Sequence, residues 1–232
     1  MKHSKLYPTL TAIGLASLAT LLTACGTIST IPIAESVRSR IHVVSVDSDV
    51  KLPPEMTFMD QGQGAALMLG GPIIGSLIAN NSASTPKAQL SAEMQANHIV
   101  LGDILAAEFA KQASANSTMK FVVNDATADA RVHLIVNAYG VMQAQPFGST
   151  LYPLINVSAV MKAPDGTVIW QAMEVAGPHH RDNNEGHTYE DYTKDPELLR
   201  QVLISCSGIA SRMLANNLMG QEKAQNSPGI QQ

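Results

Sequence analysis

The chain has 232 residues, a length that suits one domain with its own hydrophobic core. It carries 15 Lys and Arg against 19 Asp and Glu, a formal net charge of −4, and no stretch gathers basic residues into a stripe. This balance argues against a nucleic-acid-binding protein, because phosphates need a basic surface. The cysteines are Cys25 and Cys206.

The first 24 residues have the pattern of a secretory signal. The opening MKHSKLYPTL contains Lys2 and Lys5 and no acid, and residues 11–24 are uncharged and end in small side chains. A basic start, a short apolar run and small residues are typical of a cleaved signal. The run is too short to span a bilayer, which takes about 20 apolar residues. We therefore expect residues 1–24 to be a signal peptide.

Leu22, Thr23, Ala24 and Cys25 resemble the lipobox of bacterial lipoproteins, Leu-x-(Ala/Gly)-Cys. The resemblance implies cleavage after Ala24, a diacylglyceryl group on the Cys25 thiol, and a further acyl chain such as palmitate on its freed amine. Three chains would anchor the protein lastingly, because one chain alone binds a bilayer only marginally. Gly26, in place of the Asp that commonly signals retention at the inner membrane, implies the outer membrane. The alternative is an ordinary secreted protein with a cysteine near its cleavage site.

Composition divides the rest of the chain into a tether, a domain and a tail. We expect a lipidated tether at 25–40, a periplasmic α/β domain at 41–221 with an uncharged Gly-rich insertion at 61–86, and a disordered tail at 222–232.

The first half of the domain begins with a strand in residues 40–50, RIHVVSVDSDV, which is rich in β-branched side chains. Pro53 and Pro54 then predict irregular chain, because proline breaks both helix and sheet hydrogen bonding. Residues 87–117 have helical periodicity and place Leu101, Leu105 and Phe109 on one stripe.

The second half contains most of the predicted sheet. Strands are expected at 119–125 and 130–142, and residues 151–177 form the clearest hairpin, with its turn at Pro164, Asp165 and Gly166. A polar loop at 178–194 leads to the last helix. Asp195 is its expected N-cap, and Gly220 follows its end near residue 219.

This order of elements predicts an α/β (α+β) fold, a two-layer sandwich in which a mostly antiparallel sheet of about four to five strands packs against two main helices. The arrangement resembles the small periplasmic domain of envelope lipoproteins, including the curli-export pore and penicillin-binding-protein activators. The shared cues are the DGTVIW hairpin at 165–170 and the closing amphipathic helix. A shared fold implies no shared function.

The uncharged segment at 62–80 alternates glycines with aliphatic residues. The preferred interpretation is a Gly-rich loop that covers the core. The alternative is a membrane or oligomer contact, with Gly71 and Gly75 spaced as in a weak helix-contact motif. Its candidate residues are Gly62, Gly64, Leu67, Leu69, Gly71, Ile74, Gly75 and Leu77. A barrel hairpin is disfavoured, because residues 65–69 are apolar at every position and do not alternate.

The polar loop contains His179, His180 and His187, which together with nearby acids make weak candidates for a metal site. No HExxH spacing is present, and a solvated loop without metal is the preferred interpretation. Catalytic signals are also lacking: no G-x-S-x-G elbow occurs, and Cys206 lies in an apolar helical pattern that predicts a small core residue. Trp170 is expected at the interface between sheet and helices. We expect no enzyme, no catalytic residue and no cofactor besides the lipid on Cys25.

The sequence therefore predicts an outer-membrane lipoprotein whose periplasmic domain is a structural or interaction module in envelope assembly. Its expected partners are the membrane, through the anchor, and an envelope protein, with a homo-oligomer as a further option and no nucleic acid. The main alternative is an oligomeric secretion or transport accessory that uses residues 62–80 at the membrane. The third is a periplasmic metal binder or hydrolase.

Overall fold

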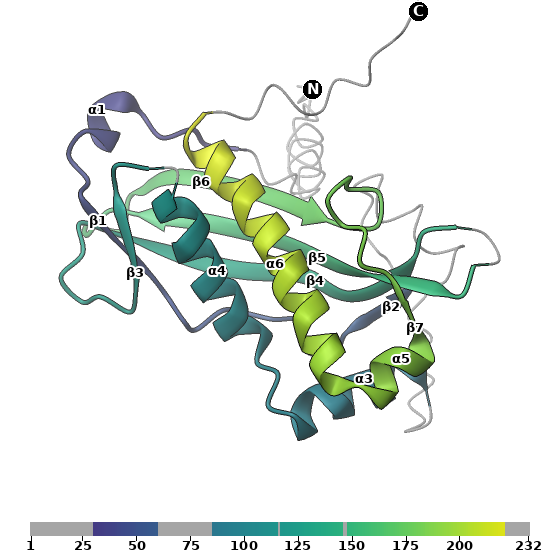
Figure 1. Ribbon diagram of the computed structural model, residues 1–232. Coiled ribbons are helices and arrows are strands. Elements are labelled where there is room, and N and C mark those ends of the chain that lie inside the picture. Colours follow the sequence, from purple (N-terminus) through teal and green to yellow (C-terminus); the bar gives the residue numbers. More distant parts are fainter. Residues whose placement is uncertain (1–29, 60–84, 116, 146–147, 221–232) are drawn as a thin grey trace, which may run out of the picture.

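A computed structural model describes residues 30–59, 85–115, 117–145 and 148–220. These form two layers, with α4 and α6 lying across one face of a sheet (Figure 1). The elements in chain order are α1 (Glu35–Arg38), β1 (Val43–Val46), β2 (Thr57–Met59), α3 (Pro86–Ala96), α4 (Leu101–Ala115), β3 (Lys120–Val123), β4 (Ala130–Gln143), β5 (Thr150–Lys162), β6 (Val168–Ala176), β7 (His187–Thr188), α5 (Tyr189–Lys194) and α6 (Pro196–Leu218).

The sheet has seven strands, and its main path runs in the order β3-β1-β4-β5-β6. Strands β4, β5 and β6 pair antiparallel, whereas β1 lies parallel to both β3 and β4. Two short strands join this path, β2 on β4 and β7 on β5. The predicted two-layer α/β fold with a mostly antiparallel sheet is confirmed, with more strands than the four to five expected.

The additional strands lie where the sequence predicted irregular chain. Pro53 and Pro54 prevent pairing only at their own positions, and β2 forms three residues after Pro54 and pairs with residues 140–142 of β4. Strand β7 and helix α5 occupy the end of the predicted polar loop. There Thr188 and Asp191 form a capping box in which each side chain accepts a hydrogen bond from the other's backbone N–H.

The predicted single helix at 87–117 is wrong in one respect, because it breaks into α3 and α4. Asn97 ends α3, and His98 takes a left-handed conformation with φ of 51°. The break lets the two halves cover different neighbours: Leu90 of α3 and Phe109 of α4 are both buried, but α3 packs near α5 and β2, and α4 packs against α6. A straight helix could not reach both surfaces.

Aromatic side chains join the two layers. Trp170 of β6 is fully buried and stacks on Phe109 of α4, with ring centroids 6.3 Å apart and planes at 20°. Its indole nitrogen donates to the Asn217 side-chain oxygen of α6 at 3.2 Å. Phe121 of β3 meets Phe109 edge-on at 5.9 Å. The predicted place of Trp170 between sheet and helices is confirmed.

The predicted turn and helix caps also form. The β5–β6 hairpin turns at Asp165 and Gly166, whose φ of 86° suits glycine. The Asp195 carboxylate accepts hydrogen bonds from the backbone of Glu197 and Leu198, both at 3.1 Å, so it caps α6 as expected. Gly220 follows this helix with φ of 73°. Among the helices that the structure describes, none is both long and apolar enough to cross a membrane.

Candidate functional site

Several predicted site residues lie outside the described part of the chain. They are Cys25 with its cleavage site and the eight candidate contact residues of the Gly-rich segment: Gly62, Gly64, Leu67, Leu69, Gly71, Ile74, Gly75 and Leu77. The lipid anchor and the membrane or oligomer contact therefore stay predictions.

The histidines of the polar loop are described, and each has its own surroundings. The Nδ1 atom of His180 accepts a hydrogen bond from the Asp182 backbone at 3.2 Å, and burial lowers the pKa of His180. His187 packs edge-on against the Tyr192 ring, with centroids 5.8 Å apart. The Asp182 carboxylate is paired with Arg212 of α6. Within residues 30–59, 85–115, 117–145 and 148–220, no three His, Cys, Asp or Glu side chains are grouped so that they could hold a metal ion.

Cys206 is a buried thiol in α6, as the sequence predicted. Its Sγ contacts the carbonyl oxygen of Ala176 at 3.7 Å, and burial raises the thiol pKa to about 12. A thiol needs its thiolate form to act as a nucleophile. Cys206 therefore lacks the properties of a reactive cysteine.

A β-bulge in β4 directs part of this strand toward the helices. The pairing with β5 shifts register between Val136 and Ala138. Before the shift, even-numbered residues such as Val136 enter the core, and after it Tyr139 and Val141 pack against the core instead. The bulge thereby turns the Tyr139 ring toward the helix layer.

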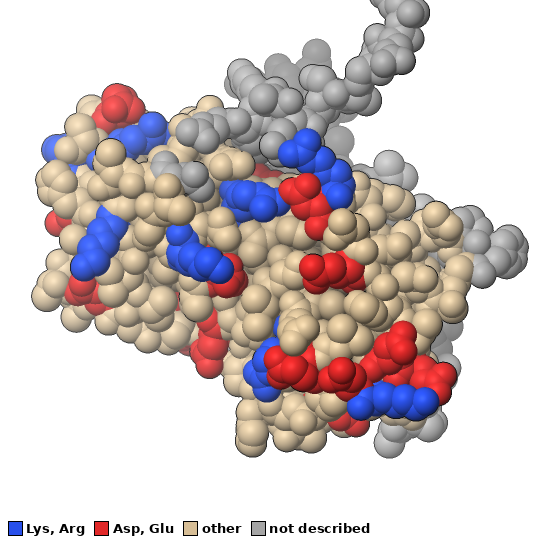
Figure 2. Space-filling view, viewed as in Figure 1, with Lys and Arg blue, Asp and Glu red and all other residues tan. Residues whose placement is uncertain are grey.

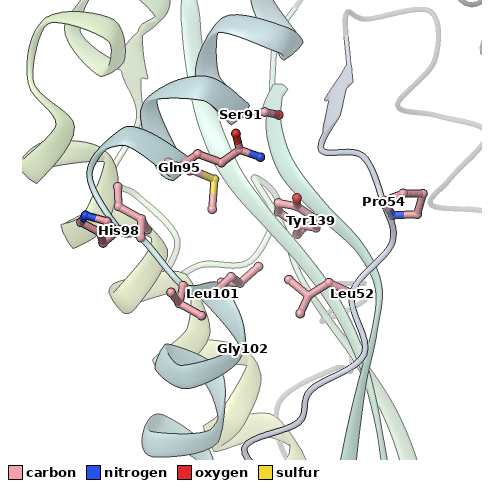
Figure 3. A pocket seen from close by; sticks show the side chains of 11 residues that line it. Leu52, Pro54, Ser91, Gln95, His98, Leu101, Gly102 and Tyr139 are labelled. Carbon is pink, nitrogen blue, oxygen red and sulfur yellow. The ribbon is translucent and has the colours of Figure 1, made fainter.

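A cleft of about 380 Å³ opens beside Tyr139, between α3, the start of α4 and the chain that precedes β2 (Figure 3). The break between the two helices creates it, because α3 and α4 diverge there. Its walls combine apolar and polar groups: Leu52, Pro54, Met94, Ile99, Val100 and Leu101 beside Ser91, Gln95, His98 and Tyr139. Burial raises the pKa of Tyr139, so its hydroxyl is a neutral donor at physiological pH.

The polar groups of the cleft do not form a hydrogen-bonded catalytic pair among the described residues. Ser91 and His98 both line the cleft, but Figure 3 shows them apart along α3 and its end, with Gln95 between them. No hydrogen bond joins the two among the described residues, so a serine activated by a base is not formed. A pocket that combines apolar walls with several polar groups is typical of a binding site. This cleft was not predicted from the sequence, although the Asn-His dipeptide in mid-helix is a signal for the break.

The chain enters the domain at the free edge of β6. Ile31 and Gln171 exchange backbone hydrogen bonds of 2.8 and 3.0 Å, and Ile33 is buried. The Arg38 guanidinium of α1 donates to the Leu218 carbonyl at the end of α6, at 2.9 Å. Residues 31–38, which the sequence assigned to the tether, are thus fastened to both layers of the domain.

Charged side chains are mixed over the face that carries α4 and α6 (Figure 2). Acidic residues gather where α5 and α6 begin, and Glu190, Asp191 and Glu197 lie in the first turns of these helices. Acids at helix N-termini are stabilised by the helix dipole. This cluster is therefore explained by local structure.

Comparison with known proteins yields only distant similarities. No protein-family model matches the chain, and no curated protein matches it. The PelC dodecamer from Paraburkholderia phytofirmans is 12% identical, with a TM-score of 0.41 over 82% of this chain and 93% of that one. Protein XCC0632 from Xanthomonas campestris is 9% identical, with a TM-score of 0.41 over 78% and 86%. Lipoprotein GNA1162 from Neisseria meningitidis is 10% identical, with a TM-score of 0.24 over 58% and 81%. Likenesses this distant assign no function to the chain.

Proposed function

We propose that the chain is a lipoprotein of the bacterial outer membrane, acylated on Cys25, whose periplasmic domain is an interaction module in envelope assembly. The observation that carries the proposal is the short distance in sequence between the lipobox and the domain. Ile31 already pairs with β6, six residues after Cys25. Six extended residues reach at most about 20 Å. A lipid anchor on Cys25 would therefore hold the domain close to the bilayer, with the edge of β6 nearest to it.

Apolar side chains near this edge fit the proposed orientation. Ile31 is 36% exposed and Met173 of β6 is 40% exposed. Large apolar groups beside a lipid anchor can rest at the headgroup region of the bilayer, where each adds to the free energy of membrane binding. The cleft beside Tyr139 is the binding surface in this proposal, and its partner is an envelope protein that supplies an apolar segment.

Binding is favoured over catalysis because neither Cys206 nor Ser207 has an activating base among the described residues. The Cys206 thiol is buried and protonated, and the hydroxyl of Ser207 is buried with no hydrogen-bond partner in the described residues. An interaction module needs only the shaped surface.

The anchor is tested with a matched pair of cysteine variants. Cys25→Ala removes the proposed acylation site, whereas Cys206→Ala removes a buried thiol and serves as the control. After metabolic labelling with palmitate and envelope fractionation, we expect the wild type and Cys206→Ala to be labelled and in the outer membrane. We expect Cys25→Ala to be unlabelled and released or unprocessed. Equal labelling and location of all three proteins would sink the proposal.

The partner surface is tested with photo-crosslinking residues placed at two exposed valines. Val100 is 53% exposed beside the cleft, and Val123 is 38% exposed at the end of β3. We expect one discrete envelope-protein adduct from position 100 and none from position 123. Identical adducts from both would place the partner elsewhere. The mass of the detergent-extracted protein tests the oligomeric alternative, which a clean monomer contradicts.

A further inference from the structure

A second hollow, of about 330 Å³, lies at the other end of β4. Small residues line it: Ala126 and Ala128 come from the loop before β4, Ala130 begins β4, and Ala163, Pro164 and Gly166 come from the β5–β6 turn. The remaining lining residues are Arg131, His133 and Lys162. We call this set the basic hollow.

Sheet register places the basic side chains together. Arg131 and His133 alternate with the buried Val132 of β4, so both lie on the face away from the core. Lys162 of β5 stands directly opposite Arg131 in the antiparallel pair. Like charges in this position are destabilising. The chain therefore keeps two cations side by side at a cost in stability.

Asp47, at the end of β1, compensates only part of this charge. Its carboxylate contacts the Arg131 guanidinium at 2.7 Å with one oxygen and the His133 Nδ1 atom at 2.6 Å with the other. The Asp47 side chain is 17% exposed, whereas the side chains of Arg131 and His133 are 43% and 39% exposed. The Lys162 ammonium forms no hydrogen bond or ion pair within the part of the chain that the structure describes.

The neighbouring carboxylates accept hydrogen bonds from backbone and hydroxyl groups close to them. Asp125 accepts hydrogen bonds from the backbone and the hydroxyl of Thr127, both at 2.8 Å. Asp129 accepts from the backbone of β1, and Asp165 accepts from the Thr167 backbone at 2.9 Å. Asp125 is near enough to Arg131 to feel its charge, since Arg131 contributes to its lowered pKa after the stronger effect of Thr127. None of these carboxylates forms an ion pair with Lys162.

We propose that the basic hollow binds an oxyanion, a carboxylate or phosphate group of a ligand. The Lys162 ammonium offers three N–H donors, and Arg131 uses one of its five N–H groups on Asp47, which leaves the others for the ligand. Asp47 fixes the orientation of Arg131 and His133 in advance. The small wall residues leave room for the anion between the cations, and its charge relieves the repulsion between Arg131 and Lys162.

The test is isothermal titration calorimetry on the full-length protein, extracted in nonionic detergent. Inorganic phosphate and acetate are titrated separately. Chloride holds the ionic strength constant, because exposed charges are screened by salt. We expect saturable binding of at least one anion, weakened about tenfold or more in Lys162→Met, whose apolar stem preserves the packing. Lys111→Met is the control: it also removes one lysine, from an exposed pair with Glu108 on α4, and should leave the affinity unchanged.

Three results would overturn the proposal: no saturable binding of either anion, equal affinity in Lys162→Met and wild type, or an equal loss in both variants. The melting temperature of Lys162→Met, measured in parallel, shows that the variant is folded.

The anion that binds identifies the chemical class of the ligand group. One further measurement distinguishes a lipid headgroup from a soluble ligand. Phosphatidylglycerol added to the detergent micelle should lower the apparent affinity for phosphate if a lipid headgroup competes for the hollow. It should leave that affinity unchanged if the ligand is soluble. Because these titrations do not depend on acylation of Cys25, their failure would leave the proposed anchor untouched.

Discussion

The core and the open end of β4 both contain ionisable side chains, but these side chains are buried in the core and partly exposed at the open end. In the core, Cys206 and Tyr192 are fully buried, and burial raises the pKa of each. The Tyr192 hydroxyl donates to the Leu151 carbonyl at 2.9 Å. At the open end, Arg131 and Lys162 remain partly exposed and charged in a hollow walled by small residues.

The difference shows that the helix layer determines whether an ionisable side chain is buried or exposed. Where the helices lie on the sheet, Cys206 and Tyr192 are kept neutral and each contacts a backbone carbonyl, because a buried charge without a partner is costly. Where the sheet is uncovered, charges persist and can meet a ligand. The same strand, β4, serves both environments through its alternation and its bulge.

The largest effect should come from the core, at Trp170. Replacing Trp170 with Ala removes a fully buried ring and its stacking on Phe109, and we expect a loss of about 3–5 kcal/mol in the free energy of unfolding. Val168→Ala on the same strand is the control, since Val168 is exposed and should change stability little. Urea denaturation measures both, and a small loss at Trp170 would contradict the packing described.

The next effect concerns the cleft end, at Gly140. A Cβ atom there would lie 1.8 Å from the Thr57 carbonyl oxygen, so Gly140→Ala must push β2 away from β4. We expect a loss of about 2–3 kcal/mol, as for overpacking. Gly148→Ala, where the nearest atom would be 3.4 Å away, is the matched control. Equal melting temperatures for the two variants would contradict the tight β2–β4 pairing.

Alkaline pH should weaken the core. The folded pKa of Cys206, about 12, is above its ordinary value of 9.0, so the unfolded chain loses this proton first. The stabilisation is complete below pH 9 and is lost as the pH rises toward 12, by up to about 1.4 kcal/mol per pH unit. Unfolding free energies at pH 8, 9 and 10 should therefore fall more steeply in the wild type than in Cys206→Ala. An equal fall of the unfolding free energy with pH in both proteins would contradict this contribution of the Cys206 thiol.

The smallest expected effect is a gain in stability. Lys162→Met removes the repulsion between Lys162 and Arg131 across the β4–β5 pair, and we expect the free energy of unfolding to rise by about 0.2–1 kcal/mol in buffer without phosphate or acetate. The same variant should lose the stabilisation that these anions give the wild type. A destabilised Lys162→Met would mean that the lysine has a structural partner.

The sequence predicted the elements whose causes are local. The Asp165 turn, the Asp195 cap and the buried stripe of Leu101, Leu105 and Phe109 each depend on residues within a few positions of one another. The capping box of Thr188 and Asp191 was equally local and was missed, although its spacing is a known helix-start signal. The place of Trp170 could be predicted because one large apolar ring in a strand must face the helix layer.

Neither the cleft nor the basic hollow could be predicted from the sequence, because each is formed by residues that are distant in sequence. The cleft needs Leu52, Ser91 and Tyr139 to meet, which follows from the helix break and the β4 bulge together. The basic hollow needs Asp47 to reach Arg131, 84 positions later.

The sequence by itself determined the layers of this protein, its turns and caps, and the expectation of a lipid anchor at Cys25, because periodicity, capping and short motifs act over a few residues. The tertiary structure decided the strand order, the register that sets Arg131 beside Lys162, and the point at which Ile31 joins β6. Those features arise when the whole chain buries its apolar surface at once, and no short window of sequence contains that constraint.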